Sequence, residues 1–176
     1  GNTFTNGVMA VTHHDGFTGK TTTIENNTLT DTYMDLEKMY GTVTIQNNDI
    51  SYLPTSSSGY GILARIMSID SYTTIQNNLI RNASTGIRGC ICYDSGSPAS
   101  ILNIINNKII GQSTIGGNQD QRRGIHAQIE QSASSTGVVN ISGNSIINQA
   151  KNVSSASTWQ GSAIYVYTES VESASS

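Results

Sequence analysis

The sequence predicts an all-β protein, a solenoid of about six stacked coils with three short strands in each coil. A motif containing a pair of asparagines recurs along the chain at uneven spacing. A second set of short, β-branched segments keeps a constant order relative to that motif. Amides and hydroxyls, rather than charged groups, fill most of the positions between these segments. Together these observations favour a repeat architecture over an ordinary globular domain.

The repeated motif is Ile-x-(Asn or Gly)-Asn-x-(Ile or Leu). Its short β-branched segments indicate strands, and Asn tolerates the left-handed backbone that a sharp bend between strands requires. A fixed motif at uneven spacing indicates a coil of constant circumference with loops of variable length. We expect the second Asn of each copy to stack in one column, with left-handed or bridge backbone angles and amides bonded along the column. This ladder comprises Asn27, Asn48, Asn78, Asn107 and Asn144, and the tail of a sixth copy opens the chain at Gly1-Asn2-Thr3-Phe4.

Each coil also contains a strand that is usually opened by glycine, and aligning these strands gives the register between coils. Alternation along residues 62–66 places Ile62, Ala64 and Ile66 inward. The middle inward site is mostly small, which indicates a narrow interior; its members are Ala10, Ala64, Gly89 and Ala127. By the same alternation Met9 and Val11 should point outward. A third strand follows each Asn bend, and six coils stacked at about 4.8 Å would give a rod roughly 29 Å tall.

The composition excludes several classes of protein. Charged residues make up 12% of the chain and the formal net charge is −3, while Ile, Val and Thr recur throughout, which is unlike a disordered chain. A pI near 5.5 gives no basic footprint, so nucleic acid is not an expected partner. No apolar run approaches a membrane span. The chain opens at Gly1 with no signal peptide, so we expect residues 1–176 to be a single segment of a longer chain.

The coils built on this motif resemble the right-handed parallel β-helix superfamily, which includes pectate lyases and related polysaccharide lyases, phage tailspikes and many surface proteins. The resemblance covers nearly the whole chain. It implies a right-handed parallel β-helix with the Asn ladder at the bend between the second and third strands. It also implies that the glycine-led strand is the first strand, whose outer face often carries the carbohydrate groove. The fold hosts many activities and specifies none of them.

The outward face of this first strand is richer in titratable and aromatic groups than the rest of the chain. Arginines there can bind carboxylates in a bidentate way, and tyrosines can stack on sugar rings. The alternative is an ordinary solvated sheet face with cross-strand charge pairs. The candidate substrate-binding residues are Arg65, Arg88, His126, Tyr165 and Tyr167.

Candidates for catalysis are weaker. In chondroitinase-B-like and alginate lyases of this fold, a Lys and an Arg on adjacent coils act on the substrate's uronate. The resemblance carries these roles loosely onto Lys38 and Arg65. Lys38 shares parity with inward residues and points outward only if its strand ends first, and no acidic cluster with calcium-ligand spacing accompanies the pair.

The two cysteines form a Cys-x-Cys pair on one strand face. In an extended strand the Cα atoms of Cys90 and Cys92 would lie roughly 6.6 Å apart, near the limit for a disulfide. Two thiols with His126 as the one possible neighbour fall short of a zinc site. We therefore expect free or partly buried thiols, no metal site and no cofactor.

Two function classes remain. The first, which we favour, is a noncatalytic rod of an extracellular, cell-surface or virion-surface protein, with a structural, adhesive or phage-fibre role that can include binding a polysaccharide or cell-surface glycan. The second is a polysaccharide lyase or glycoside hydrolase acting on an acidic polysaccharide along the first-strand face. Both ends of such a rod expose unpaired strand edges. We therefore expect the ends to meet a continuation of the same chain or to stack on another chain.

Overall fold

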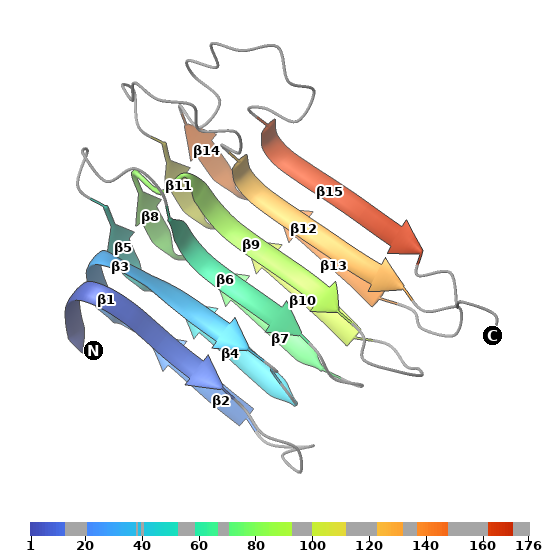
Figure 1. Ribbon diagram of the computed structural model, residues 1–176, viewed down its shortest axis with the longest axis horizontal. Helices are drawn as coiled ribbons and strands as arrows, with labels where there is room; N and C mark the ends of the chain where they lie inside the picture. The colour runs from blue at the N-terminus through green and yellow to red at the C-terminus, as the bar shows by residue number, and fades with distance from the viewer. Residues whose placement is uncertain are drawn as a thin grey trace.

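The structure is a computed structural model that describes residues 1–12, 21–37, 39, 41–52, 59–66, 71–92, 100–111, 123–131, 137–147 and 162–170. The described residues form β-strands in two sheets, and every strand pairing between them is parallel (Figure 1). This part of the chain contains no helix long and apolar enough to cross a membrane. The prediction of an all-β protein is confirmed.

The five-stranded sheet consists of the strands that precede each Asn bend. These are β2 (Thr21–Glu25), β4 (Thr42–Gln46), β7 (Tyr72–Gln76), β10 (Ser100–Ile105) and β13 (Gly137–Ser142).

The ten-stranded sheet has two parts that share the long strands β1 (Thr3–Thr12) and β3 (Thr28–Glu37). One part follows the Asn bends and contains β5 (Asp49–Ser51), β8 (Leu79–Arg81), β11 (Lys108–Ile110) and β14 (Ser145–Ile147). The other contains β6 (Tyr60–Ile66), β9 (Thr85–Cys92), β12 (Arg123–Gln131) and β15 (Ser162–Ser170).

The bend between these two parts lies inside β1 and β3. Strand β3 pairs with β5 through residues 28–30 and with β6 through residues 34–36. Between these segments Asp31 has a positive φ of 49°, and Asn6 has 55° at the equivalent place in β1. Each repeat therefore contributes segments to three columns of parallel strands, in a solenoid-like arrangement.

The Asn ladder runs through the buried bend that follows the five-stranded sheet. The backbone N–H and the side-chain Nδ2 of Asn48 both donate to Oδ1 of Asn78 at 3.0 Å. The same pair of bonds recurs at every step. The Nδ2 groups also donate to backbone carbonyls, as Asn48 does to Ile24 and Gln46. The predicted column is confirmed and includes Asn2, Asn27, Asn48, Asn78, Asn107 and Asn144.

The left-handed residues lie one position before the ladder, so the left-handed alternative expected for the ladder residues was wrong, and the bridge alternative stays a prediction. Positive φ occurs at Asn26, Asn47, Asn77, Asn106 and Gly143, with values from 55° to 65°. The first residue of each Asn pair makes the bend, and the second directs its amide into the interior. Glycine replaces Asn in the last copy because the left-handed region costs glycine nothing.

Two apolar columns flank the ladder and form most of the core. Ile45 precedes one ladder residue and Ile50 follows it, and both are fully buried. The column in the five-stranded sheet comprises Ile24, Ile45, Ile75, Ile104 and Ile141. The column after the bend comprises Leu29, Ile50, Ile80, Ile109 and Ile146.

The first repeat corrects the predicted alternation by one residue. Val11 pairs with the buried Leu36, which in turn pairs with Ala64, so Val11 occupies the middle inward site. Ala10 pairs with Asp35 and is exposed. Met9 and Val11 therefore point inward and Ala10 outward. The apolar run at residues 8–11 has no polar residue to show which side faces the core, so its parity could not be determined from its own pattern.

Glycine is the second residue of β6, β9 and β12 because neighbouring backbones approach closely there. A Cβ on Gly61 would lie 2.5 Å from the carbonyl oxygen of Gly86, and one on Gly86 would lie 2.7 Å from that of Gly124. Each added Cβ would also meet the Cγ2 atom of an isoleucine, at 2.5 or 2.6 Å. Any larger residue would separate the strands that carry the outer face.

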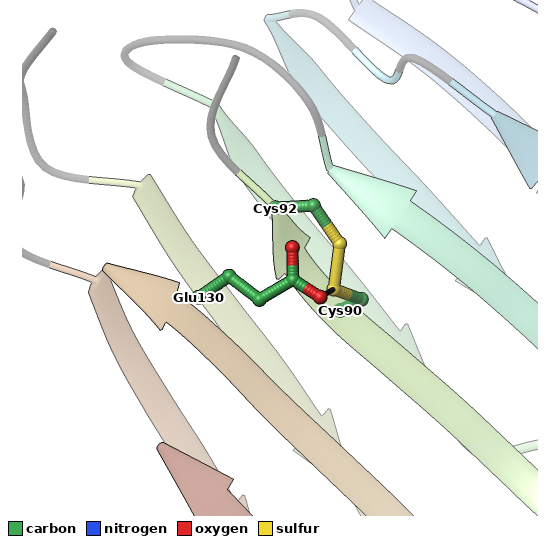
Figure 2. A group of neighbouring side chains, drawn as sticks. All are labelled: Cys90, Cys92 and Glu130. Atoms are coloured by element: carbon green, nitrogen blue, oxygen red, sulfur yellow. Dashed lines mark hydrogen bonds between the residues drawn. A yellow bond between two sulfur atoms is a disulfide. The ribbon is translucent and has the colours of Figure 1, made fainter. Parts of the chain in front are cut away.

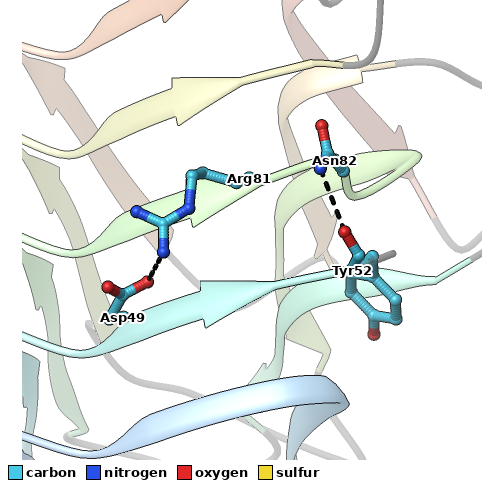
Figure 3. A network of polar contacts seen from close by, with 4 residues as sticks. All are labelled: Asp49, Tyr52, Arg81 and Asn82. Atoms are coloured by element: carbon cyan, nitrogen blue, oxygen red, sulfur yellow. Dashed lines mark hydrogen bonds and ion pairs between the residues drawn. The ribbon is translucent and has the colours of Figure 1, made fainter. Parts of the chain in front are cut away.

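A polar corner joins the two parts of the ten-stranded sheet (Figure 3). Asn82 Nδ2 donates to the carbonyl oxygen of Tyr52 at 3.0 Å, and the buried Tyr52 hydroxyl donates to the carbonyl of Tyr60 at 2.8 Å. Nearby, Arg81 and Asp49 form a partly exposed ion pair at 2.6 Å. Such surface pairs contribute only about 0–1 kcal/mol, so the corner depends mainly on the partly buried hydrogen bonds of Tyr52 and Asn82.

We predict that Asn78→Ala lowers the free energy of unfolding by about 3 kcal/mol or more. The change leaves the backbone N–H of Asn48 and the carbonyl of Ile45 without their amide partner in the interior. Urea denaturation measures the loss. The matched control is Asn140→Ala, which removes an exposed amide bonded to Asn103 and should cost no more than about 0.5 kcal/mol. Equal costs for the two variants would contradict the ladder's role.

We also predict that the chain self-associates through its terminal strands. Val8 in β1 and Ile164 and Val166 in β15 are about half exposed, and within the described residues β1 pairs only with β3 and β15 only with β12. Sedimentation velocity should show a concentration-dependent increase in mass that Val166→Lys reduces. Thr42→Lys, on a lateral surface, should leave the association unchanged. A monomer at all concentrations would refute this prediction.

Candidate functional site

All five predicted glycan-binding residues lie on one face, the outward side of β6, β9, β12 and β15. They belong to two adjacent rows of side chains in register, which we call the outer strip. The first row contains Leu63, Arg88, His126 and Tyr165, and the second contains Arg65, Cys90, Gln128 and Tyr167. Their shared face follows from the strand register, whereas their binding role remains a prediction.

The two predicted arginines have different surroundings. Arg65 forms an ion pair with Glu37 of the neighbouring strand. Arg88 donates to the Tyr60 hydroxyl at 3.1 Å and lies 5.8 Å above the centre of that ring. Arg65 is therefore neutralised by a carboxylate, whereas Arg88 is held by a phenol that carries no charge of its own. Lys38, the other predicted catalytic residue, lies outside the described residues.

The C-terminal end of the outer strip forms an open hollow of about 190 Å³. Tyr165 and Tyr167 lie nearly parallel, with 9° between their planes and 6.3 Å between their centres. The His126 ring meets Tyr165 edge to face at 5.2 Å. We call this feature the Arg123 hollow; its lining residues are Arg123, His126, Gln128, Tyr165 and Tyr167.

Arg123 is the residue that sequence reasoning missed. Its side chain is 4% exposed, its guanidinium carbon lies 4.2 Å above the Tyr165 ring, and NH1 lies 2.8 Å from Nδ1 of His126. Its Nε is buried without a hydrogen-bond partner. No carboxylate of the described residues forms an ion pair with it. The predicted strands are usually opened by glycine, which here is Gly124, whereas β12 already begins at Arg123.

The same contacts hold His126 in its neutral form. Burial lowers the pKa of His126 to about 4, and the cations Arg123 and Arg88 contribute in the same direction. Arg123 NH1 lies 2.8 Å from Nδ1 and 3.3 Å from Nε2 of His126, and because a guanidinium can only donate, the ring nitrogen that accepts from it is unprotonated. Burial also lowers the pKa of Arg123 itself. The hollow therefore has one buried cation next to an uncharged imidazole.

A second group of side chains lies where β9 and β12 end (Figure 2). Cys90 and Cys92 form a disulfide with their Cα atoms 5.5 Å apart, so the expectation of free thiols was wrong. The strand is less extended here than the ideal spacing of roughly 6.6 Å assumed. Glu130 pairs with Cys92 across the sheet, and its Oε1 lies 3.8 Å from Sγ of Cys90. Gln128 Nε2 donates to the same Oε1 at 2.8 Å.

Comparison with protein-family models, with curated proteins and with solved structures found no match to this chain. The resemblance to β-helical proteins therefore depends on the repeated motif, the ladder and the parallel pairing. The site must be interpreted from its own geometry.

We predict that the His126 environment makes stability depend on pH. The pKa of His126 is about 4 in the folded chain and 6.5 in the unfolded chain. The unfolded state therefore binds more protons between these values, and stability is lost as pH falls from about 6.5 toward 4. Between pH 7 and pH 5 this should remove roughly 1–2 kcal/mol. Urea denaturation at both pH values should show a smaller loss for His126→Gln, whereas Gln76→Ala should behave as the wild type. If His126→Gln lost as much stability between pH 7 and pH 5 as the wild type, this would contradict the buried neutral imidazole.

Proposed function

We propose that the chain is a segment of a right-handed parallel β-helix of about six three-stranded coils, and that it is a noncatalytic extracellular or surface rod that binds an acidic glycan along its outer strip. The parallel pairing, the three columns and the Asn ladder support the fold. The hydroxyl-rich, low-charge composition and the Cys90–Cys92 disulfide support an extracellular, cell-surface or virion-surface location.

The observation that carries the binding proposal is the buried guanidinium of Arg123 at the hollow. A buried charge without an opposite charge is costly by several kcal/mol. The face of the Tyr165 ring offsets only part of this cost. An anion entering the hollow could accept from the Nε that has no partner. Arginine binds planar carboxylates through paired donors, which suits the carboxylate of a uronic acid.

The remaining groups of the outer strip suit a sugar chain that lies along the rod. Adjacent strands are about 4.8 Å apart, close to the rise of one sugar residue, so successive residues could meet successive strands. Tyr165 and Tyr167 offer apolar ring faces with polar hydroxyls for stacking. Arg88 lies one strand before His126 in the same row and adds a second cation.

An enzymatic alternative is favoured by a different group at the N-terminal end of the strip. Asp35 and Glu37 lie on β3 beside Arg65, and burial raises the pKa of Asp35 although Arg65 opposes the shift. A carboxyl group whose pKa is raised by burial is typical of a general acid. Turnover of a uronate polymer, detected as absorbance of an unsaturated product and abolished by Asp35→Asn, would favour a polysaccharide lyase.

We predict that the double variant Arg88→Ala, Tyr167→Ala loses at least about tenfold in affinity for a polyuronate in affinity electrophoresis. Both changes remove side chains of the outer strip and leave the Asn ladder unaltered. Arg123→Met should reduce binding to the polyuronate more than binding to an uncharged glucan. The matched control is Tyr72→Ala, which removes a 48% exposed tyrosine from the five-stranded sheet and should leave binding unchanged. Wild-type affinity in the double variant would refute the role of the strip.

A further inference from the structure

The ends of β9 and β12 bring three potential metal ligands together, none of which lines the Arg123 hollow. The Sγ atoms of Cys90 and Cys92 and a carboxylate oxygen of Glu130 all lie within 4.8 Å of one another (Figure 2). Cys90 is buried, whereas Cys92 and Glu130 are partly exposed. The group is therefore held by the sheet on one side and open to solvent on the other.

We propose that Cys90, Cys92 and Glu130 form a binding site for a thiophilic divalent cation such as Zn²⁺ when the disulfide is reduced. From the sequence we named His126 as the one possible third ligand beside the two thiols, whereas the register places Glu130 opposite Cys92. Two thiolates and a carboxylate are ligands that zinc accepts, and a fourth position remains for water. The site is thus a redox-gated metal site on the surface of the sheet.

The distances agree with tetrahedral coordination. Zinc binds sulfur at about 2.3 Å and oxygen at about 2.0 Å, which separates a sulfur and an oxygen ligand by roughly 3.5 Å. The Cys90 Sγ and Glu130 Oε1 atoms are 3.8 Å apart. Two sulfur ligands would lie roughly 3.8 Å from each other. With the Cα atoms 5.5 Å apart, rotation of the two side chains supplies this separation without moving the strands.

The neighbouring residues hold the donors in place. Register with β12 is maintained from residue 85 to residue 92 of β9, so the Cys92–Glu130 pair cannot slide. Gln128 donates to the Glu130 carboxylate and orients it toward Cys90. A hydrogen bond of this kind to a ligating carboxylate is the usual outer support of a metal site.

Metal binding and the disulfide exclude each other because a thiolate is the ligand. With a phosphine as reductant, the disulfide, the phosphine and one water molecule give two thiols and a phosphine oxide. The sulfurs gain the two electrons that the phosphorus loses. Binding of Zn²⁺ then releases the two thiol protons. An oxidising environment keeps the site closed, and reduction opens it.

The test is a titration of the whole chain with Co²⁺ and Zn²⁺ under anaerobic conditions, after reduction with a phosphine. Co²⁺ should give thiolate-to-metal absorption at one equivalent, and Zn²⁺ should displace it. The oxidised chain should show no such absorption. Glu130→Gln should weaken Zn²⁺ binding at least about tenfold in competition with a chromogenic chelator. Cys92→Ser should abolish stoichiometric binding.

Asp49→Asn is the matched control, because this carboxylate is also partly exposed and paired, but lies on β5 and away from the cysteines. It should bind Zn²⁺ as the wild type does. Circular dichroism establishes that each variant keeps its strands. Equal binding by the oxidised and reduced chains, or equal affinities for Glu130→Gln and Asp49→Asn, would overturn the proposed site.

Discussion

The buried amides of the Asn ladder are the constraint on which the rest of the structure depends. Each ladder residue from Asn2 to Asn107 donates both its backbone N–H and its side-chain Nδ2 to the amide of the next repeat. The side chains of Asn48, Asn78, Asn107 and Asn144 also donate to main-chain carbonyls. A slip of one residue would leave these groups unsatisfied in the interior, where each costs about 1–3 kcal/mol. The bend is therefore fixed in every repeat. The connections are not, since the steps between ladder residues range from 21 to 37 residues and the entropic cost of a longer loop grows slowly.

This fixed register decides which side chains meet on the outer face. In parallel strands the same position of each repeat falls in one row, so Arg88, His126 and Tyr165 are neighbours although they are far apart in sequence. A change of one residue would turn that row toward the core. The narrow interior strengthens the constraint, because a Cβ on Gly86 would have no room beside the carbonyl of Gly124 and the side chain of Ile109. The ladder and the glycines thus position the outer strip, although their own side chains do not belong to it.

Much of this arrangement could be predicted from the sequence because the repeated motif shows which residues of successive coils are equivalent. The ladder, the parallel stacking and the shared face of the five outer residues follow from aligning the Asn pairs. The misses have physical causes. Residues 8–11 are uniformly apolar and do not reveal their parity, so Ala10 was placed inward. Glu130 became visible as a neighbour of Cys92 only with the exact pairing of β9 and β12. Arg123 was missed because it precedes the glycine of its strand, and the first residue of a strand carries no alternation signal.

Within the described residues, the charges of this sparsely charged chain are arranged unevenly. Arg81 and Arg65 each form an ion pair with a carboxylate of the adjacent strand, and both pairs are partly exposed. Arg123 is buried and faces an imidazole and a phenol ring instead. A structural role alone would be served as well by an apolar residue of similar volume, because unpaired buried charges weaken a fold.

The neutral form of His126 leaves Arg123 as the one cation that lines the hollow. A protonated imidazole would repel the Arg123 guanidinium, and the depressed pKa of His126 keeps that ring uncharged except in acid. The hollow consequently presents one cation with unused hydrogen-bonding capacity beside two parallel tyrosine rings. The cation would complement an anionic group, and the two tyrosine rings would complement the flat face of the ring that carries it. The fold tolerates the buried cation because β12 pairs along its length with β9 and β15, and the buried ladder and isoleucine columns supply stability that offsets an unpaired charge.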